Sequence, residues 1–199
     1  MRNTFLYCLV IMVAFGFGCT QKNKYNAPAV KIETNFGDII VELYPAQAPK
    51  TVAAFLSYVD SGYYENGSFY RVLKSEDQPS NAFKCDLVQG GIWESNYKKQ
   101  SAVPGINHET TKQTGILHKD GTISLARIAP GSANTEFFIV IGDQPAYDYD
   151  GDANPDGQGF AAFGRVVDGM EYVKQIHSQP DNQTSFTPPI LIKNIVRLK

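Results

Sequence analysis

The sequence is poor in cysteine, has no block of like charge and has no apolar run of full membrane-spanning length. Its 199 residues include three cysteines, at positions 8, 19 and 85, which excludes a disulfide-stapled scaffold. Lys and Arg total 18 against 20 Asp and Glu, and no dense Lys/Arg cluster occurs. Because nucleic-acid binding needs a concentrated basic face, this composition argues against a nucleic-acid partner.

Glycine, proline and aromatic residues are, in contrast, well represented. The chain contains 17 glycines and 11 prolines, and aromatic side chains make up 12% of it. This composition is typical of a β-rich globular protein with many turns, and not of a disordered or coiled-coil chain. The length suits a single domain with a core of its own.

The N-terminal residues have the pattern of a targeting segment. Arg2 precedes an apolar run over residues 5–17, which is shorter than the about 20 residues of a typical membrane helix. The small residues before Cys19 resemble the lipobox of bacterial lipoproteins, although Gly16 stands where that pattern usually has Leu. We therefore predict a lipoprotein-type signal peptide over residues 1–18, with lipid attached to Cys19. A cleaved secretion signal without lipid and an N-terminal anchor helix are the alternatives.

A short tether and one domain are predicted to follow. Residues 19–28 are polar, lack apolar periodicity and end in proline, as expected for a flexible tether. Residues 29–199 show no repeat and no second linker, so they are predicted to form one domain. With Cys8 removed and Cys19 lipidated, Cys85 would be the one free thiol, which fits an oxidising compartment. We therefore expect a membrane-anchored protein outside the cytoplasm.

Short strand patterns separated by turn residues dominate the domain. Residues 29–44 form two strand-like runs around Asn35-Phe36-Gly37-Asp38, which predicts a hairpin. Helices are predicted from Pro49 to Ser61-Gly62 and over 170–177, because apolar residues recur there with helical spacing. Further strands are predicted over 68–73, 86–89, 122–127, 136–141, 161–167 and 190–198. Many short strands with only two helices favour a closed antiparallel barrel, which exposes no sheet edge.

Four segments, in register along the chain, resemble cyclophilin-type peptidyl-prolyl cis-trans isomerases. They are TNFGDIIVELYPAQAPKTVAAFLSYVDSGYYENGSFYRV, LVQGG, GTISLARIAPGSANTEFFIVIGD and FAAFGRVVDGMEYV. The resemblance extends from about Lys31 to Lys199. It implies a mainly β fold, a closed eight-stranded antiparallel barrel with a helix closing each end, which agrees with the barrel favoured by the strand pattern.

The activity implied by this resemblance is rotation about the peptide bond before proline. Rotation about a peptide C–N bond has a barrier of about 18–20 kcal/mol, because resonance is broken. No covalent bond forms, so we expect no cofactor, nucleophile or metal. An apolar pocket would hold the proline ring, and a donor aimed at the prolyl nitrogen would lower the barrier, since its lone pair is free only in the twisted transition state.

The resemblance assigns the catalytic pair to Arg71 and Gln89. Arg71 in FYRV matches the family's catalytic Arg, and Gln89 in LVQGG matches the Gln that positions this Arg and bonds the substrate backbone. Taken alone, Arg71 would be interpreted as a surface residue paired with a carboxylate. Proline-containing polypeptide segments are the implied partner, and the substrate-binding positions match Leu87, Ala126, Arg127, Glu136, Phe138, Tyr147 and Phe160.

Asp86 departs from the family pattern in the proline pocket. It stands where the family has Phe, and an added stretch over residues 74–85 precedes it. Loss of an aromatic wall predicts proline binding weaker by about 1–3 kcal/mol. Phe83 in the added stretch is a candidate substitute that would fold over the pocket.

Glu136 departs from the pattern beside the catalytic residues, where it replaces the usual Gln. A carboxylate accepts hydrogen bonds but does not donate them, whereas an amide does both. We expect Glu136 to lie beside Arg71, to pair with it and to draw the guanidinium away from substrate. The alternative is that Glu136 orients Arg71 for catalysis.

An acidic segment and three histidines are the candidate metal ligands in the sequence. Residues 152–157 resemble the opening of a calcium loop, but Phe163 stands where the closing Glu would be. We interpret the segment as a solvated acidic turn, with calcium binding as the alternative. His108, His118 and His177 lack ligand spacing and are interpreted as ordinary loop or helix residues, so no metal site is predicted.

The sequence as a whole predicts a monomeric, lipid-anchored prolyl isomerase that assists the folding of extracytoplasmic proteins. One alternative is a catalytically weak module or chaperone that binds proline-containing segments on the same fold. A structural envelope lipoprotein that uses the barrel as a scaffold is the other. Arg71 and Gln89 favour the enzyme, because neither alternative requires that pair.

Overall fold

The computed structural model describes residues 25, 27–81 and 83–198 of the chain. The predicted signal peptide over residues 1–18, the lipidation residue Cys19 and most of the predicted tether lie outside the described residues. In the part that is described, no helix combines the length and the apolar character needed to cross a bilayer.

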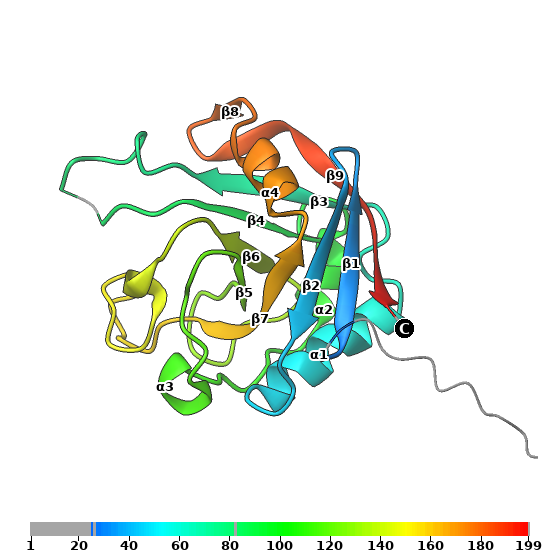
Figure 1. Cartoon of the computed structure of the whole chain (residues 1–199), viewed down its shortest axis with the longest axis horizontal. Coiled ribbons are helices and arrows are strands. Elements are labelled where there is room, and N and C mark those ends of the chain that lie inside the picture. Colours follow the sequence, from blue (N-terminus) through cyan, green and yellow to red (C-terminus); the bar gives the residue numbers. More distant parts are fainter. Residues whose placement is uncertain (1–24, 26, 82, 199) are drawn as a thin grey trace, which may run out of the picture.

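Eight antiparallel strands close into a barrel, as predicted (Figure 1). Around the barrel the order is β1 (Ala29–Thr34), β2 (Asp38–Leu43), β7 (Ala161–Asp168), β5 (Thr122–Leu125), β6 (Phe137–Val140), β4 (Leu87–Gly91), β3 (Gly67–Leu73) and β9 (Ser185–Leu198). Pairing of β1 with β9 joins the two ends of this order and closes the sheet. A two-residue strand, β8 (Asp181–Asn182), extends beyond the barrel and pairs with the start of β9.

Two helices lie toward opposite ends of the barrel, where the sequence places them (Figure 1). Helix α1 (Pro49–Asp60) begins with proline and buries Val52, Phe55, Leu56 and Val59. The Glu109 carboxylate accepts hydrogen bonds from the Lys50 and Thr51 amides, at 3.2 and 2.8 Å, which satisfies the free amides at the start of the helix. Helix α4 (Met170–His177) buries Val173 and Ile176.

The prediction of only two helices is wrong, because three short helical turns also occur. They are α2 (Tyr97–Ala102), α3 (Thr111–Thr114) and the 3-10 turn η1 (Pro145–Tyr147). Local capping rather than apolar periodicity determines two of them. The Asn96 side chain accepts from the Lys99 amide at the start of α2, and Thr110 and Gln113 form a capping box at α3.

The strands separate two apolar clusters, and the second of these forms the base of a surface site. The barrel interior holds the larger cluster, in which Phe55, Tyr64, Phe69, Phe137 and Phe163 are fully buried. Residues that alternate with the interior ones point to the other face of the sheet. There Cys85, Leu87, Phe138, Val140 and Tyr147 form the smaller cluster.

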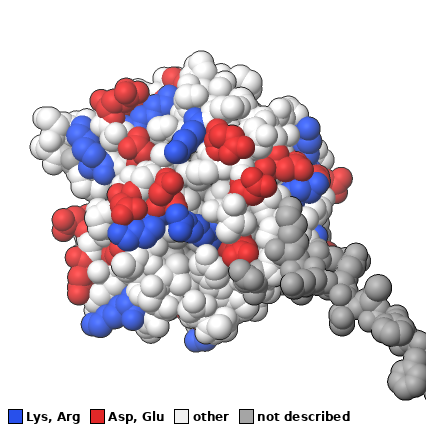
Figure 2. All heavy atoms as spheres, in the orientation of Figure 1, with Lys and Arg blue, Asp and Glu red and all other residues white. Residues whose placement is uncertain are grey.

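Charged side chains of both signs are mixed over the face shown in Figure 2. In the β1–β2 hairpin, Lys31 lies 2.7 Å from Glu33 and 3.3 Å from Asp38. A continuous basic surface is absent from this face.

Candidate active site

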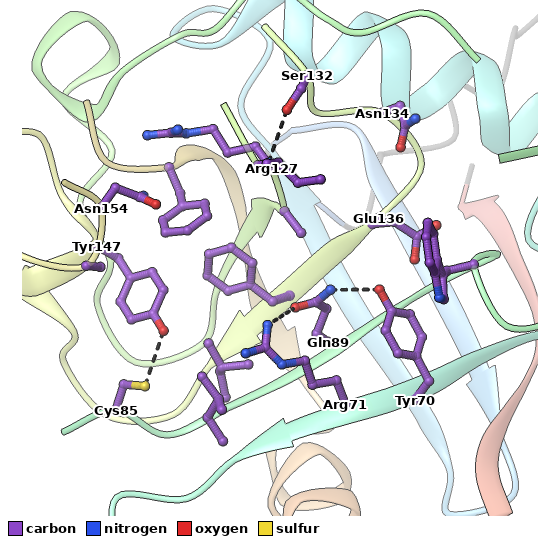
Figure 3. A pocket seen from close by; sticks show the side chains of 18 of the residues that line it. Tyr70, Arg71, Cys85, Gln89, Arg127, Ser132, Asn134, Glu136, Tyr147 and Asn154 are labelled. Carbon is purple, nitrogen blue, oxygen red and sulfur yellow. Dashed lines mark hydrogen bonds between the residues drawn. The ribbon is translucent and has the colours of Figure 1, made fainter. Parts of the chain in front are cut away.

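A cavity of about 650 Å³ opens on the outer face of β3, β4 and β6 (Figure 3). One part of its lining is apolar and aromatic, and the other part carries amide, hydroxyl and guanidinium groups. Such a combination is typical of a site that buries an apolar group while polar groups orient its backbone. The structure brings together all the predicted site residues at this cavity, namely Arg71, Leu87, Gln89, Ala126, Arg127, Glu136, Phe138, Tyr147 and Phe160.

Arg71 and Gln89 face each other across neighbouring antiparallel strands. They are register partners of β3 and β4, next to an irregularity between Phe69 and Arg71. The Nη1 of Arg71 donates to Oε1 of Gln89 at 3.3 Å (Figure 3). Donor groups of the guanidinium other than Nη1 have no hydrogen bond to the described residues, so they can meet a substrate in the cavity.

Tyr70 extends this pair into a chain of three side chains, which the sequence analysis missed. Nε2 of Gln89 donates to the Tyr70 hydroxyl at 2.7 Å, while Oε1 of Gln89 accepts from Arg71 (Figure 3). The Gln89 amide is therefore held at both ends. Burial raises the pKa of Tyr70, so its hydroxyl stays neutral. In the sequence, the one sign of a role for Tyr70 at the site was its position next to Arg71. Alternation along a strand predicts that adjacent side chains point to opposite faces of the sheet, which argued against such a role.

Aromatic rings form the apolar part of the cavity, as the resemblance implied. Phe138 and Phe160 meet edge to face with centroids 5.1 Å apart, and Tyr147 lies 5.4 Å from Phe138 and 5.1 Å from Phe160. The Tyr147 hydroxyl donates to Cys85 Sγ at 3.2 Å, below the rings. Leu87 and Ala126 complete this wall, which is apolar and can pack against an apolar group in the cavity.

His118 supports this aromatic wall and is not the ordinary loop residue that we predicted. Its Nδ1 lies 2.7 Å from Asp148 Oδ1 and its Nε2 lies 3.1 Å from Ser124 Oγ. The imidazole stacks parallel to the Phe138 ring at 6.0 Å. Both Ser124 and His118 are fully buried, so this Ser-His-Asp arrangement is closed to substrate and acts as a support.

Arg127 lines the cavity, but its guanidinium is committed to the acidic segment beside it. It forms two hydrogen bonds with the Asp156 carboxylate, at 2.7 and 2.8 Å, and two with the Gly159 carbonyl, at 2.8 and 2.6 Å. The guanidinium also lies 5.3 Å from the Phe160 ring centroid. Arg127 lowers the pKa of Asp156 to about 2, so this pair is charged at neutral pH.

Two carboxylates in or beside the acidic segment bind side chains within the protein. Asp148 holds His118 and Asp156 holds Arg127. Within the described residues no group of three or more His, Cys, Asp or Glu side chains is arranged to hold a metal ion. The calcium alternative therefore gains no support from the geometry.

Arg127→Gln is expected to raise KM about threefold and to leave kcat nearly unchanged, because the segment that carries Phe160 loses its clamp. Kinetics and hydrogen exchange of the amides of residues 156–160 measure the two effects. Lys119→Gln is the control, since it removes an exposed ion pair with Asp143. Unchanged KM with unchanged exchange would show that the clamp does not position Phe160.

Glu136 does not pair with Arg71, so that expectation is wrong. Its Oε1 accepts from the Ile92 amide at 3.0 Å and from the Thr135 hydroxyl at 2.9 Å. Its Oε2 is buried without a hydrogen bond of good geometry. A Cβ at Gly91, whose φ is +153°, would overlap the carboxylate, so glycine makes this position possible. Among the described residues, the guanidinium of Arg71 hydrogen-bonds to Gln89.

Burial determines the ionisation of Glu136. It raises the carboxyl pKa, whereas the hydrogen bonds from the Ile92 amide and the Thr135 hydroxyl, and the nearby polar groups of Tyr70 and Trp93, lower it. Figure 3 shows Glu136 on the far side of Tyr70 from Gln89 and Arg71. The carboxylate thus lies at the end of the chain of polar side chains and not in contact with the catalytic guanidinium.

The comparison with known proteins agrees with this geometry. The sequence model of the family described as cyclophilin type peptidyl-prolyl cis-trans isomerase/CLD matches residues 29–197. Peptidyl-prolyl cis-trans isomerase B of Escherichia coli (strain K12) is 35% identical over 148 residues, which are 74% of this chain and 82% of the relative. The cyp18 isomerase of Streptomyces antibioticus is 34% identical over 148 residues, 74% of this chain and 81% of the relative.

Solved structures share the fold at lower identity. A cyclophilin-type isomerase of Cryptosporidium parvum, crystallised in the presence of the dipeptide Ala-Pro, has a TM-score of 0.67 at 24% identity and covers 86% of this chain and 99% of its own. Cyclophilin AquaCyp293 of Hirschia baltica has a TM-score of 0.64 at 18% identity, with 84% of this chain and 73% of its own covered. These similarities support the barrel architecture.

Proposed function

The chain belongs to the cyclophilin-type peptidyl-prolyl cis-trans isomerase family, and from this premise we propose that it isomerises X-Pro bonds in proteins outside the cytoplasm and so assists their folding. X-Pro isomerisation takes tens to hundreds of seconds without a catalyst and can limit folding. The substrate is a loop or unfolded segment, because the cavity is open and its polar groups can reach an extended backbone.

The observation that carries this function is the Arg71–Gln89 contact beside the aromatic pocket. The rings hold the proline while the preceding peptide bond rotates. Out of conjugation, the prolyl nitrogen gains a lone pair that can accept a hydrogen bond from the Arg71 guanidinium. Because the planar ground state offers no such acceptor, this bond stabilises the transition state selectively.

A protease-coupled isomerisation assay on the purified protein tests the proposed activity. An Ala-Pro or Leu-Pro peptide is expected to isomerise faster in proportion to enzyme concentration. The alternative of a non-enzymatic binding module rested on Asp86 and Glu136. It is disfavoured because neither residue disturbs the contact between Arg71 and Gln89. Peptide binding without acceleration would support the binding module instead.

The membrane anchor is the part of this proposal that depends on Cys19 and the preceding apolar run. Cys19→Ala is expected to move the protein from the membrane fraction to the soluble extracytoplasmic fraction, because a lipid anchor would be lost. Fractionation with mass spectrometry of the N-terminus measures this, and Cys8→Ala is the matched control. A Cys19→Ala protein that stays in the membrane with residues 1–18 attached would instead indicate an anchor helix.

A further inference from the structure

The segment that joins β3 to β4 adds an aromatic ring to the cavity. Phe83 lines it and meets Tyr147 edge to face, with centroids 5.7 Å apart and planes at 75°. Tyr147 in turn contacts Phe138 and Phe160, so four rings are continuous. Phe83 remains 37% exposed, which leaves apolar surface that a bound group can cover.

Asp86 closes the base of this segment and takes no part in lining the cavity. Its Oδ1 accepts from the Ser75 amide at 3.0 Å, which joins the end of the segment to its beginning. His177 Nε2 lies 3.4 Å from the same oxygen and 2.9 Å from the Leu73 carbonyl oxygen. The carboxylate is therefore directed toward the segment and α4.

Further contacts fix the same segment on both sides. Lys74 Nζ lies 2.6 Å from Asp181 Oδ2 and donates to the Gln179 carbonyl at 3.0 Å. Gln78 donates through Nε2 to the Cys85 carbonyl at 2.6 Å. Cys85 is buried and accepts from Tyr147, so the segment is joined directly to the aromatic wall that it faces.

We propose that this segment is part of the proline-binding site, with Phe83 as a wall that contacts substrate and Asp86 as the residue that positions it. The proposal rests on the proposed isomerase function and names the group that determines substrate affinity. Asp86, which replaces the family's Phe, thus anchors the segment that supplies Phe83 as another aromatic ring. An apolar wall contacts ground state and transition state alike, so Phe83 contributes to KM rather than to kcat.

Phe83→Ala tests the wall directly in the full-length protein. NMR titration with the tetrapeptide Ala-Ala-Pro-Phe measures Kd, and exchange spectroscopy of the same samples measures isomerisation. We expect Phe83→Ala to weaken binding about threefold to fivefold with kcat within twofold, and Phe83→Leu to retain most of the affinity. Leu191→Ala is the control, because Leu191 is 39% exposed, close to the exposure of Phe83, and does not line the cavity. Wild-type affinity in a folded Phe83→Ala protein would overturn the proposal.

Asp86 is tested through its dependence on Phe83. Asp86→Ala is expected to weaken binding as Phe83→Ala does, to add nothing in the Phe83→Ala background, and to be rescued by Asp86→Asn, which keeps an acceptor for Ser75. Asp86→Phe is also expected to weaken binding, because its side chain points away from the cavity. Additive losses, or tighter binding by Asp86→Phe, would overturn the positioning role. If the wild type bound the peptide but did not isomerise it, the proposed function would be refuted, whereas the role of Phe83 as a wall of the binding site would still hold.

Discussion

Arg71→Ala is expected to lower kcat/KM for X-Pro isomerisation at least tenfold, about 1.4 kcal/mol of transition-state stabilisation. The side chain stands at the polar part of the cavity and gives one donor to Gln89, so its remaining donors serve the rotating bond. The loss should appear mainly in kcat, because the interaction with the prolyl nitrogen exists only in the twisted state. Exchange spectroscopy with an Ala-Pro peptide separates kcat from KM.

Arg71→Lys distinguishes the geometry of the guanidinium from its charge. An ammonium group keeps the charge but cannot place one donor on Gln89 and others on substrate in a single plane, so most of the loss should remain. Arg165→Ala is the matched control, since Arg165 is exposed on β7 and bonds to the Asp120 carbonyl. Wild-type turnover by a folded Arg71→Ala protein would exclude Arg71 as the catalytic residue.

Period-two and period-3.6 patterns were sufficient to predict the barrel and its two main helices. The hairpin of β1 and β2 and the boundaries of α4 agree with the sequence analysis to within a residue. Helices α2 and α3 were missed because they contain six and four residues, too few for a periodic apolar face. Their signals, Asn96 and the Thr110–Gln113 capping box, are local hydrogen bonds that many turns also show.

Side-chain direction was the part of the site that the sequence could not determine. The resemblance placed Glu136 correctly at the cavity, but its carboxylate takes the position that turns it from Arg71 only because Gly91 has no Cβ there. His118 looked ordinary because its partners, Asp148 and Ser124, are brought to it by other elements of the fold. Phe83 was predictable as a candidate because it was the one aromatic residue in the added stretch.

Glu136 is now expected to orient Arg71 indirectly, which reverses the expectation drawn from charge alone. Its carboxylate lies next to Tyr70, the hydroxyl that receives the Gln89 amide. A negative carboxylate attracts the Tyr70 hydroxyl proton and leaves the oxygen free to accept from Nε2 of Gln89. That arrangement keeps Oε1 of Gln89 toward Arg71.

Glu136→Gln is therefore expected to lower kcat/KM about fivefold to tenfold, roughly 1–1.4 kcal/mol. An amide donor placed against Tyr70 would turn the hydroxyl proton toward Gln89, whose amide would then present its NH₂ to the guanidinium. Repulsion between donors would displace Arg71 while peptide affinity stays nearly constant. Glu33→Gln is the control, because that carboxylate pairs with Lys31 on β1, away from the cavity.

Acidification should have the same effect on the wild type. Because burial raises the Glu136 pKa above its usual 4.5, protonation begins at a higher pH than for an exposed glutamate, and activity should fall toward that of Glu136→Gln as pH decreases. Tyr70 and Tyr64, the phenols that interact with the carboxyl, stay neutral throughout, because burial raises the pKa of each. The kcat/KM of Glu136→Gln should not change with pH. Adding Tyr70→Phe to Glu136→Gln should lower kcat/KM little further, because both substitutions act through the same chain of hydrogen-bonded side chains. A Glu136→Gln enzyme faster than wild type at neutral pH would show instead that the carboxylate restrains Arg71.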